Sequence, residues 1–130
     1  MIKESAKPNI SAYQTMLLIV FALATKGYTV LKNEEIVPTL HKALNERTKI
    51  LFEDIAFKET IEGDVFSEDI SMALTRLCAF GVLCHIEPMD KYIISIIPCE
   101  AKTALQAFDD KYVNIVSEVA EFFEKEKNNE

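Results

Sequence analysis

Cysteine and histidine side chains offer this chain's most versatile chemistry, and Cys78, Cys84, His85 and Cys99 fall within one short stretch. Thiolates and imidazoles are the usual ligands of a structural zinc ion. The spacing matches no zinc knuckle or ribbon, and Cys84 and His85 are neighbours on an expected strand, where successive side chains point to opposite faces. The same divergence keeps them from acting as a nucleophile and its base. We predict reduced, mostly buried thiols and no metal or cofactor.

Other catalytic motifs do not occur in the sequence. It has no glycine-rich phosphate loop, no Gly-x-Ser-x-Gly turn around a serine nucleophile and no Glu-x-x-His pair. The acidic pairs Glu53-Asp54 and Asp109-Asp110 are more typical of solvated faces than of paired catalytic carboxylates. We predict that the protein is not an enzyme.

The elements that must position these residues are mostly helical. Ser11 is a typical N-cap and Gly27 follows a long apolar stretch, which predicts a helix over 11–25 that its neighbours enclose on several sides. We expect a short strand over 28–31. The helix is therefore either central to the domain or part of a subunit interface.

Two shorter helices are expected next. Asn33 resembles an N-cap before two glutamates, and Pro38 fits the first turn of a firm helix over 38–47. A second helix is expected over 48–58, followed by a loop over 59–66. The residues expected to face inward from the two helices are Leu40, Ala43, Leu44, Leu51, Phe52, Ile55 and Ala56.

The most informative stretch begins with a strong helix signal. Ser67 is an N-cap before two acids, apolar residues then repeat at helical spacing, and Gly81 ends the helix. Two strands joined by a turn at Pro88 follow, over 82–86 and 91–97. The stretch predicts a helix that leads into an antiparallel hairpin.

This order of elements resembles the second half of a winged helix-turn-helix domain. In that superfamily the recognition helix leads through a glycine and two apolar residues, here Gly81-Val82-Leu83, into a β-hairpin wing. The resemblance covers 11–97 as an order of elements and 67–97 as residues. It implies a mainly α (α+β) fold of about five helices with a small antiparallel hairpin, and it ordinarily implies DNA binding.

Few cations are available for such binding. The candidates for nucleic-acid contacts are Arg76 on the recognition helix, Lys91 on the wing, and a cluster of Lys42, Arg47 and Lys49 on the preceding segment. Phosphate contacts supply most of the non-specific affinity for DNA and need nearby cations. The alternative for the cluster is a solvated helix face.

The distribution of acids disfavours DNA further. The 130 residues carry a net charge of −7. Residues 1–50 carry +3 (seven basic, four acidic), residues 51–70 carry −6 (one basic, seven acidic) and residues 100–130 carry −4 (four basic, eight acidic). The acids crowd directly before the expected recognition helix, where a duplex would lie.

The C-terminal segment, 99–126, carries a heptad pattern that predicts one long helix. At 1.5 Å per residue about 26 residues span about 39 Å, against about 36 Å for the diameter of the whole domain. We infer a homodimer through this helix, and the alternative is a helix that packs only on its own domain. The candidate dimer seam is Leu105, Phe108, Tyr112, Ile115, Val119 and Phe122.

The composition fits a single domain over 1–130, with a core over 11–97 and a packing or dimerisation helix over 99–126. The longest apolar run, 16–24, is too short to cross a bilayer, which needs about 20 residues. A secretion signal is the alternative for this run, and the polar, partly acidic segment before it disfavours that reading. We expect a cytoplasmic protein with no membrane partner.

Two functions are consistent with these features. We favour a non-catalytic, winged-helix-like interaction module that acts through protein–protein contacts as a homodimer. Its acidic surface would suit an adaptor, inhibitor or immunity-type protein that meets a basic partner. The alternative is a small DNA-binding transcriptional regulator of winged-helix type.

Overall fold

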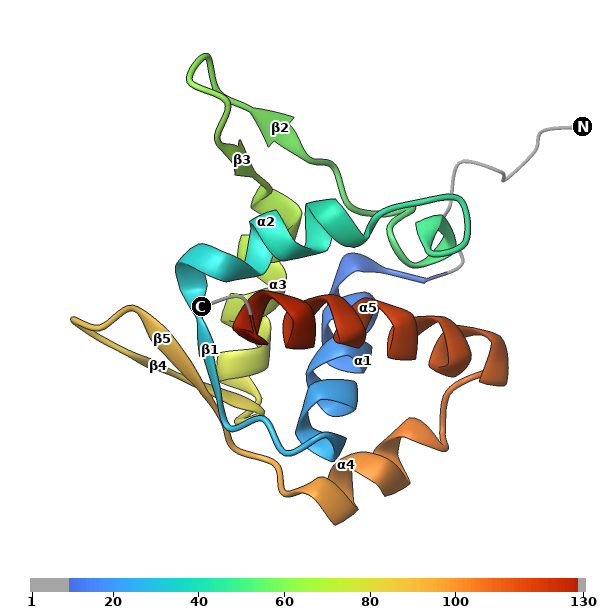
Figure 1. Ribbon diagram of the computed structural model, residues 1–130. Helices are drawn as coiled ribbons and strands as arrows, with labels where there is room; N and C mark the ends of the chain where they lie inside the picture. The colour runs from blue at the N-terminus through green and yellow to red at the C-terminus, as the bar shows by residue number, and fades with distance from the viewer. Residues whose placement is uncertain (1–9, 129–130) are drawn as a thin grey trace, which may run out of the picture.

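The computed structural model describes residues 10–128, with side chains described for 10–126 (Figure 1). This part of the chain has an α+β fold with five α-helices, a small antiparallel sheet and a long last helix, as predicted. The elements are α1 (Ala12–Thr25), β1 (Val30–Lys32), α2 (Asn33–Ala43), the 3₁₀ helix η2 (Lys49–Leu51), β2 (Lys58–Glu59), β3 (Val65–Phe66), α3 (Glu68–Ala79), β4 (Leu83–Ile86), β5 (Lys91–Ile94), α4 (Pro98–Leu105) and α5 (Asp110–Asn128).

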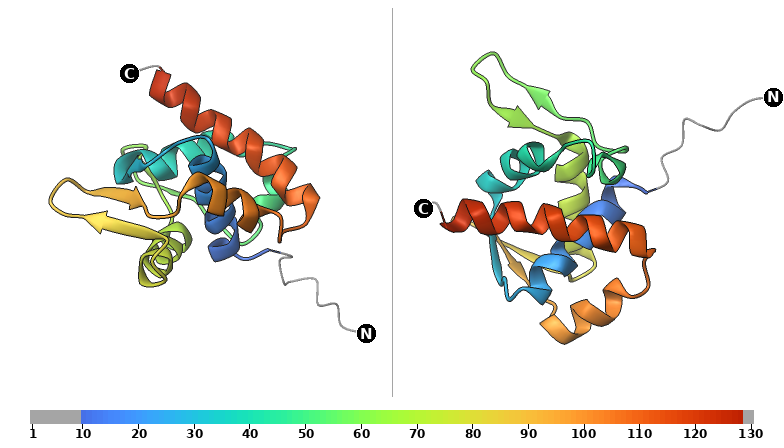
Figure 2. Two further views of the ribbon diagram at one scale, coloured as in Figure 1. Left: turned by 90° about the horizontal axis from the view of Figure 1, so that it is seen from below. Right: turned by 45° about the vertical axis from the view of Figure 1, so that its right-hand side comes forward.

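Helix α1 is the centre of the fold. The amide of Gln14 donates to Ser11 Oγ at 3.1 Å, and the amide of Ser11 donates to Gln14 Oε1 at 2.9 Å, which closes a capping box. Past its end Gly27 adopts a φ of +94°, which favours glycine. Figure 2 shows α1 between α3 and α5, and nearly all of its apolar residues are buried. The enclosed helix predicted from the sequence is confirmed.

The helix–hairpin unit is confirmed as well. Helix α3 ends before Gly81, whose φ is +82°, and the chain continues into β4 and β5. The sheet order is β1-β5-β4, with Leu31 opposite Tyr92 and Leu83 opposite Ile94. The predicted strand near residue 30 therefore joins the hairpin, so that a three-stranded sheet packs against the helices.

The C-terminal segment forms two helices, so the prediction of one continuous helix is wrong. Helix α4 ends at Leu105 and α5 begins at Asp110. Between them Asp109 caps α5: its carboxylate accepts from the amide of Lys111 at 3.1 Å, and its carbonyl accepts from the amide of Tyr112 at 3.0 Å. The single helix of about 39 Å, from which the dimer was inferred, is therefore replaced by two shorter ones.

The apolar stripe of α5 is used within the domain. The buried residues of α5 are Val116, Val119, Ala120 and Phe123, and of these only Val119 belongs to the predicted seam. The other members, Leu105, Phe108, Tyr112, Ile115 and Phe122, are half-buried and pack against the same core.

Helix α2 begins earlier and ends earlier than predicted. It begins at Asn33 with Pro38 inside it and ends at Ala43, so Arg47 lies beyond it and Leu44 is exposed. Asn33 does not cap the helix, because its amide donates to the carbonyl of Asp90 at 3.1 Å and its side chain to the carboxylate. These hydrogen bonds to Asp90 hold the first residue of α2 at the end of the sheet.

Residues 48–66 also differ from the prediction. The 3₁₀ helix η2 and irregular backbone occupy 48–57, where a helix was expected. Strand β2 begins at Lys58, and the β2–β3 hairpin projects from the body in Figure 1. Acidic side chains replace helical hydrogen bonds here, since Asp69 accepts from the amide of Ala56 at 2.9 Å. Leu51, Phe52 and Ile55 are buried as predicted, whereas Ala56 is exposed.

Across residues 10–128, no helix is both long and apolar enough to span a bilayer. One apolar core joins α1, α2, α3, α5 and the sheet. Positions 1–9, 129 and 130 of the predicted single domain lie outside the described residues.

Candidate interaction surface

The outward face of α3 carries a small aromatic and cationic cluster. Ser67 Oγ caps α3 by accepting from the amide of Ile70 at 3.3 Å. Because Ile70, Leu74 and Leu77 are buried, the opposite face of the helix is open to solvent. We call Tyr13, Met72, Arg76 and Phe80 the α3 surface.

These four side chains form a continuous patch. The guanidinium carbon of Arg76 lies 4.3 Å from the centroid of the Tyr13 ring, a cation–π contact. The rings of Tyr13 and Phe80 meet edge to face with centroids 6.0 Å apart. Met72 and Phe80 are 67% and 64% exposed. Exposed apolar side chains that gather in one patch mark interaction sites, whereas single exposed ones do not.

A shallow hollow of ≈ 180 Å³ extends the patch toward the start of α1, and Asp54 and Asp69 line it with Tyr13, Met72 and Arg76. Both carboxylates also hold the local backbone. Asp54 accepts from the amide of Ala12 at 2.8 Å, and Asp69 accepts from the amide of Ala56. These acids therefore fix the walls of the hollow and leave its rim negative.

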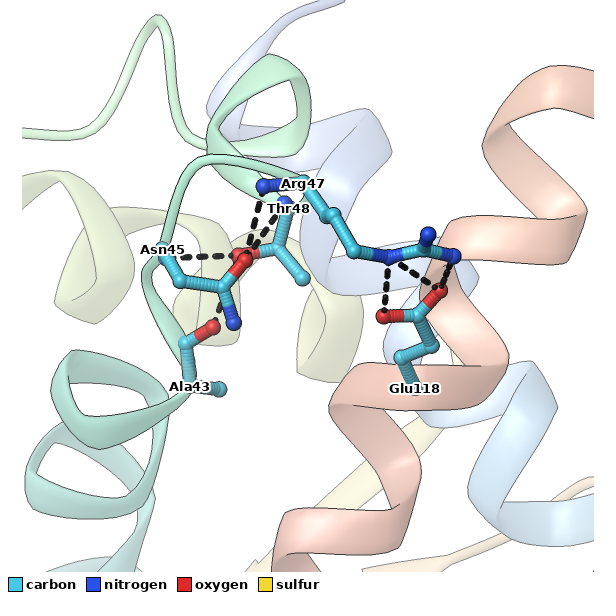
Figure 3. Close-up of polar contacts among 5 residues, drawn as sticks. All are labelled: Ala43, Asn45, Arg47, Thr48 and Glu118. Atoms are coloured by element: carbon cyan, nitrogen blue, oxygen red, sulfur yellow. Dashed lines mark hydrogen bonds and ion pairs between the residues drawn. The ribbon is translucent and has the colours of Figure 1, made fainter.

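The predicted cationic cluster is neutralised by acids. Lys42 Nζ lies 3.1 Å from Glu126 Oε2, and Lys49 Nζ lies 3.0 Å from Glu46 Oε1. Arg47 donates from Nε and Nη2 to the carboxylate of Glu118 (Figure 3). Each of the three cations of this cluster is paired, and two of the three acids come from α5.

The turn that presents Arg47 is built by Asn45 and Thr48 (Figure 3). Asn45 Oδ1 accepts from the amides of Arg47 at 2.8 Å and Thr48 at 3.0 Å. Thr48, fully buried, accepts from the amide of Asn45 at 2.9 Å and donates from Oγ1 to the carbonyl of Ala43 at 2.7 Å. This turn ends α2 and aims Arg47 at α5. The hydrogen bonds between Arg47 and Glu118 lower the pKa of the Glu118 carboxyl and raise the pKa of the Arg47 guanidinium.

The other two nucleic-acid candidates lie elsewhere. Arg76 belongs to the α3 surface, and Lys91 is half-buried on β5 opposite Lys32 and Ile86. The structure therefore does not bring the five cations together: the cluster lies on α2 and the following turn, Arg76 on α3 and Lys91 on the wing.

The three thiols and His85 of the β4–β5 hairpin have separate surroundings within the described residues. Cys84 and Cys99 are exposed and Cys78 is half-buried, so the prediction of mostly buried thiols is wrong. Burial raises the pKa of Cys78. His85 Nε2 lies 2.8 Å from Asp90 Oδ1, and its ring stacks on Tyr92 with centroids 4.7 Å apart. Within the described residues, no three His, Cys, Asp or Glu side chains are grouped closely enough to hold a metal ion.

Of the α3 surface, only Arg76 was named as a candidate from the sequence, and Tyr13, Met72 and Phe80 were not. Tyr13 lies at the start of α1, so its approach to α3 depends on tertiary packing. Phe80 had a signal, since positions 72, 76 and 80 share one helix face. Comparison of the chain with protein-family models, curated proteins and solved structures gave no match.

Proposed function

We propose that this protein is a non-catalytic, winged-helix-like interaction module that binds a protein partner through the α3 surface. The observation that carries the proposal is the exposed patch of Met72 and Phe80 around the Tyr13–Arg76 contact. Tyrosine, arginine, methionine and phenylalanine are enriched in the centres of protein interfaces.

The order of elements supports the winged-helix part of the proposal. Helices α1 and α2 precede α3, and α3 leads through Gly81 into the β4–β5 hairpin. The insertion that holds the β2–β3 hairpin lies between α2 and α3, where the winged-helix pattern has a tight turn. Function in this superfamily depends on the surface that a member presents rather than on the fold.

Charge supports a basic protein partner. Around the apolar centre, Glu68 is exposed and Asp54 and Asp69 line the hollow, while Arg76 is held on the Tyr13 ring. A partner with an apolar protrusion rimmed by lysine or arginine would match this arrangement. Such complementarity speeds association and selects the partner.

DNA binding is the second candidate, and the helix–glycine–hairpin order is the observation that favours it. Against it, acids pair with Lys42, Arg47 and Lys49. A duplex would have to displace these acids before phosphates could bind. Non-specific affinity for DNA falls steeply when fewer phosphates are neutralised.

The homodimer remains part of the proposal with weaker support. The half-buried residues Tyr112, Ile115 and Phe122 leave part of the α5 stripe open to solvent, which a second copy could cover. Sedimentation velocity over micromolar to high micromolar concentrations tests it. A concentration-dependent dimer is expected, and a monomer throughout would remove the homodimer without touching the α3 surface.

The direct test of the proposed partner site is photo-crosslinking in cells. A photoreactive phenylalanine analogue replaces Met72, and the same analogue replaces Lys111 on α5 as the control position. We expect a specific adduct from position 72 that the control lacks. The crosslinked protein is then purified, and its binding to the unmodified chain should weaken by about tenfold or more with Arg76→Ala. Unchanged binding by this variant would refute the proposal.

A further inference from the structure

The three-stranded sheet has one face on the core and one face turned to solvent. Leu31, Leu83 and Ile94 point into the core and are buried. Because side chains alternate along a strand, their neighbours in the chain point away from the core. We call six of these outward positions the outer sheet face, and none of them belongs to the α3 surface. They are Val30 and Lys32 on β1, Cys84 and Ile86 on β4, and Lys91 and Ile93 on β5.

The register brings three of these side chains into one apolar row. Ile93 on the central strand lies opposite Val30 on one side and Cys84 on the other. All three are exposed, Val30 at 40% and Ile93 at 36%. The solvent face of an antiparallel sheet is ordinarily polar, so an apolar row across all three strands departs from the usual alternation. Apolar side chains that gather in this way mark an interaction site.

The second row of the outer sheet face carries positive charge. Lys91 lies opposite Lys32 on one side and Ile86 on the other. Like charges opposite each other on neighbouring strands destabilise a sheet. Lys32 Nζ has the Glu35 carboxylate 3.8 Å away, whereas Lys91 forms no ion pair with any residue that the structure describes. On a chain with a net charge of −7, this face carries two cations and no acid.

The acids next to Lys91 in the chain are engaged by a histidine. Glu87 Oε2 lies 3.4 Å from His85 Nδ1, and Asp90 Oδ1 lies 2.8 Å from His85 Nε2. The His85 ring stacks on Tyr92, and both alternate with residues of the outer sheet face. Lys91 is half-buried, and a partly buried charge gains from a partner. A carboxylate that reaches this lysine must therefore come from another molecule.

The dimensions of the outer sheet face fit one helix. Two strand spacings of about 4.8 Å separate β1 from β4, which is about 10 Å, and an α-helix with its side chains is about 10–12 Å wide. Strands of three or four residues are about 10–13 Å long, and two to three helical turns cover that length. A helix packed on a sheet is also one of the standard layer arrangements of proteins.

We propose that the outer sheet face binds an amphipathic helix of a second protein, with carboxylates beside its apolar stripe. The stripe packs on the row of Val30, Ile93 and Cys84, and a carboxylate pairs with Lys91. A second copy of the same face would bring lysines and no acid to Lys91. DNA fits less well, because the apolar row offers nothing to phosphates. One helix buries less than a standard interface, so we expect a dissociation constant on the order of 0.1–1 mM.

The test uses the full chain and three synthetic helical peptides of one length. One has a leucine stripe flanked by glutamates, one has the same stripe flanked by lysines, and one is the glutamate peptide with its stripe scrambled. Binding is followed by the rate at which N-ethylmaleimide alkylates Cys84, and the exposed Cys99 on α4 is the internal reference.

We expect the glutamate peptide at saturation to slow the alkylation of Cys84 at least about threefold relative to Cys99, and the lysine peptide to bind at least about three times more weakly. The scrambled peptide should leave both rates unchanged. Equal protection by the glutamate and lysine peptides, or no protection by the glutamate peptide, would overturn the proposal. Protection by a random DNA duplex in place of the peptide would also overturn it.

Two variants test the two rows. Ile93→Thr keeps a β-branched residue on β5 but interrupts the apolar row, and it should weaken binding of the glutamate peptide at least about threefold. Lys91→Gln should weaken it about two- to fivefold and leave the lysine peptide no weaker. Lys102→Gln, an exposed position on α4, is the matched control and should change neither affinity. Unchanged affinity in Ile93→Thr or in Lys91→Gln would overturn the proposal. None of these results bears on the α3 surface.

Discussion

Arg47 and Glu118, 71 positions apart in the chain, form a two-point ion pair that ties the turn after α2 to the middle of α5. Lys42 and Glu126 form a second tie between the same elements two turns further along α5. Two acids of the last helix therefore pair with two of the three cations of the basic cluster, and the third, Lys49, pairs with Glu46. Lys42 and Arg47, which were expected to bind phosphates, instead pair with acids of the same chain.

The acid sensitivity of this tie can be measured. Glu118→Gln should lower the melting temperature slightly at neutral pH, because Arg47 loses its charged acceptor. The hydrogen bonds hold the folded-state pKa of Glu118 below its ordinary value of 4.5, so the stabilisation is full above that value and disappears as the pH falls through the lowered pKa. The melting curves of both proteins should converge in acid. A difference that persists unchanged to low pH would contradict the pairing.

The break between α4 and α5 can be tested by a substitution whose effect on stability would have the opposite sign in a continuous helix. Asp109→Ala should destabilise the protein by about 1 kcal/mol, because the variant loses the N-cap of α5. In one unbroken helix the same change would stabilise, since alanine has the higher helix propensity. Urea denaturation decides between them. Asp110→Ala is the control, and it should cost less because that residue only faces the helix dipole.

Substitutions on the buried and exposed faces of α3 should differ in their effect on the free energy of unfolding. Leu74 is buried, and Leu74→Ala should cost about 2–5 kcal/mol through lost burial and a cavity. Met72 is exposed on the same helix, and Met72→Ala should change the free energy of unfolding by less than about 0.5 kcal/mol. Chemical denaturation measures both. A large loss for Met72→Ala would mean that the α3 surface is part of the core.

The β4–β5 hairpin should be anchored through Asp90. Its carboxylate accepts from His85 and Asn33, hydrogen bonds that lower its pKa, and its φ of +55° is tolerated by asparagine. Asp90→Asn should therefore accelerate amide exchange in β4 and β5 at neutral pH. The Asp90 carboxylate stabilises the hairpin fully at pH values above 3.8, the ordinary pKa of an aspartate. This stabilisation is lost as the pH falls through the lowered pKa of Asp90. Unchanged exchange at neutral pH would argue against this anchor.

The helices whose two ends are both marked by local sequence signals were predicted correctly. Helix α1 begins after the N-cap Ser11 and ends before Gly27, and α3 begins after the N-cap Ser67 and ends before Gly81. Strand β1 was expected near the right position. Its pairing with β5 depends on the tertiary fold and has no local signal.

The errors arose where long-range contacts override local pattern. Leu105, the last residue of α4, and Phe108, inside the break at 106–109, both pack against the core, so the apolar spacing continues across the break. Only the cap formed by Asp109 marks that break in the sequence. Residues 48–58 look helical by spacing, but Asp54 and Asp69 bind distant backbone amides and hold an irregular path.

The pairing of Lys42 and Arg47 could not be predicted from spacing, since their acids lie 84 and 71 positions away. Lys49 differs, because its partner Glu46 is only three positions away. A double variant uses the pairing of Lys42 and Arg47 as a positive control for nucleic-acid binding. Glu118→Lys with Glu126→Lys frees Lys42 and Arg47 and adds two cations. It should bind duplex DNA at low ionic strength, with an affinity that falls steeply as salt is added.

The central claim is that the α3 surface serves a protein partner and not a duplex. The most direct measurement is the fluorescence anisotropy of a labelled random duplex, titrated with the unaltered chain at low ionic strength beside that double variant. We predict no saturable binding by the unaltered chain. Saturable, salt-sensitive binding that is lost in Arg76→Ala would contradict the claim and assign the protein to the DNA-binding alternative.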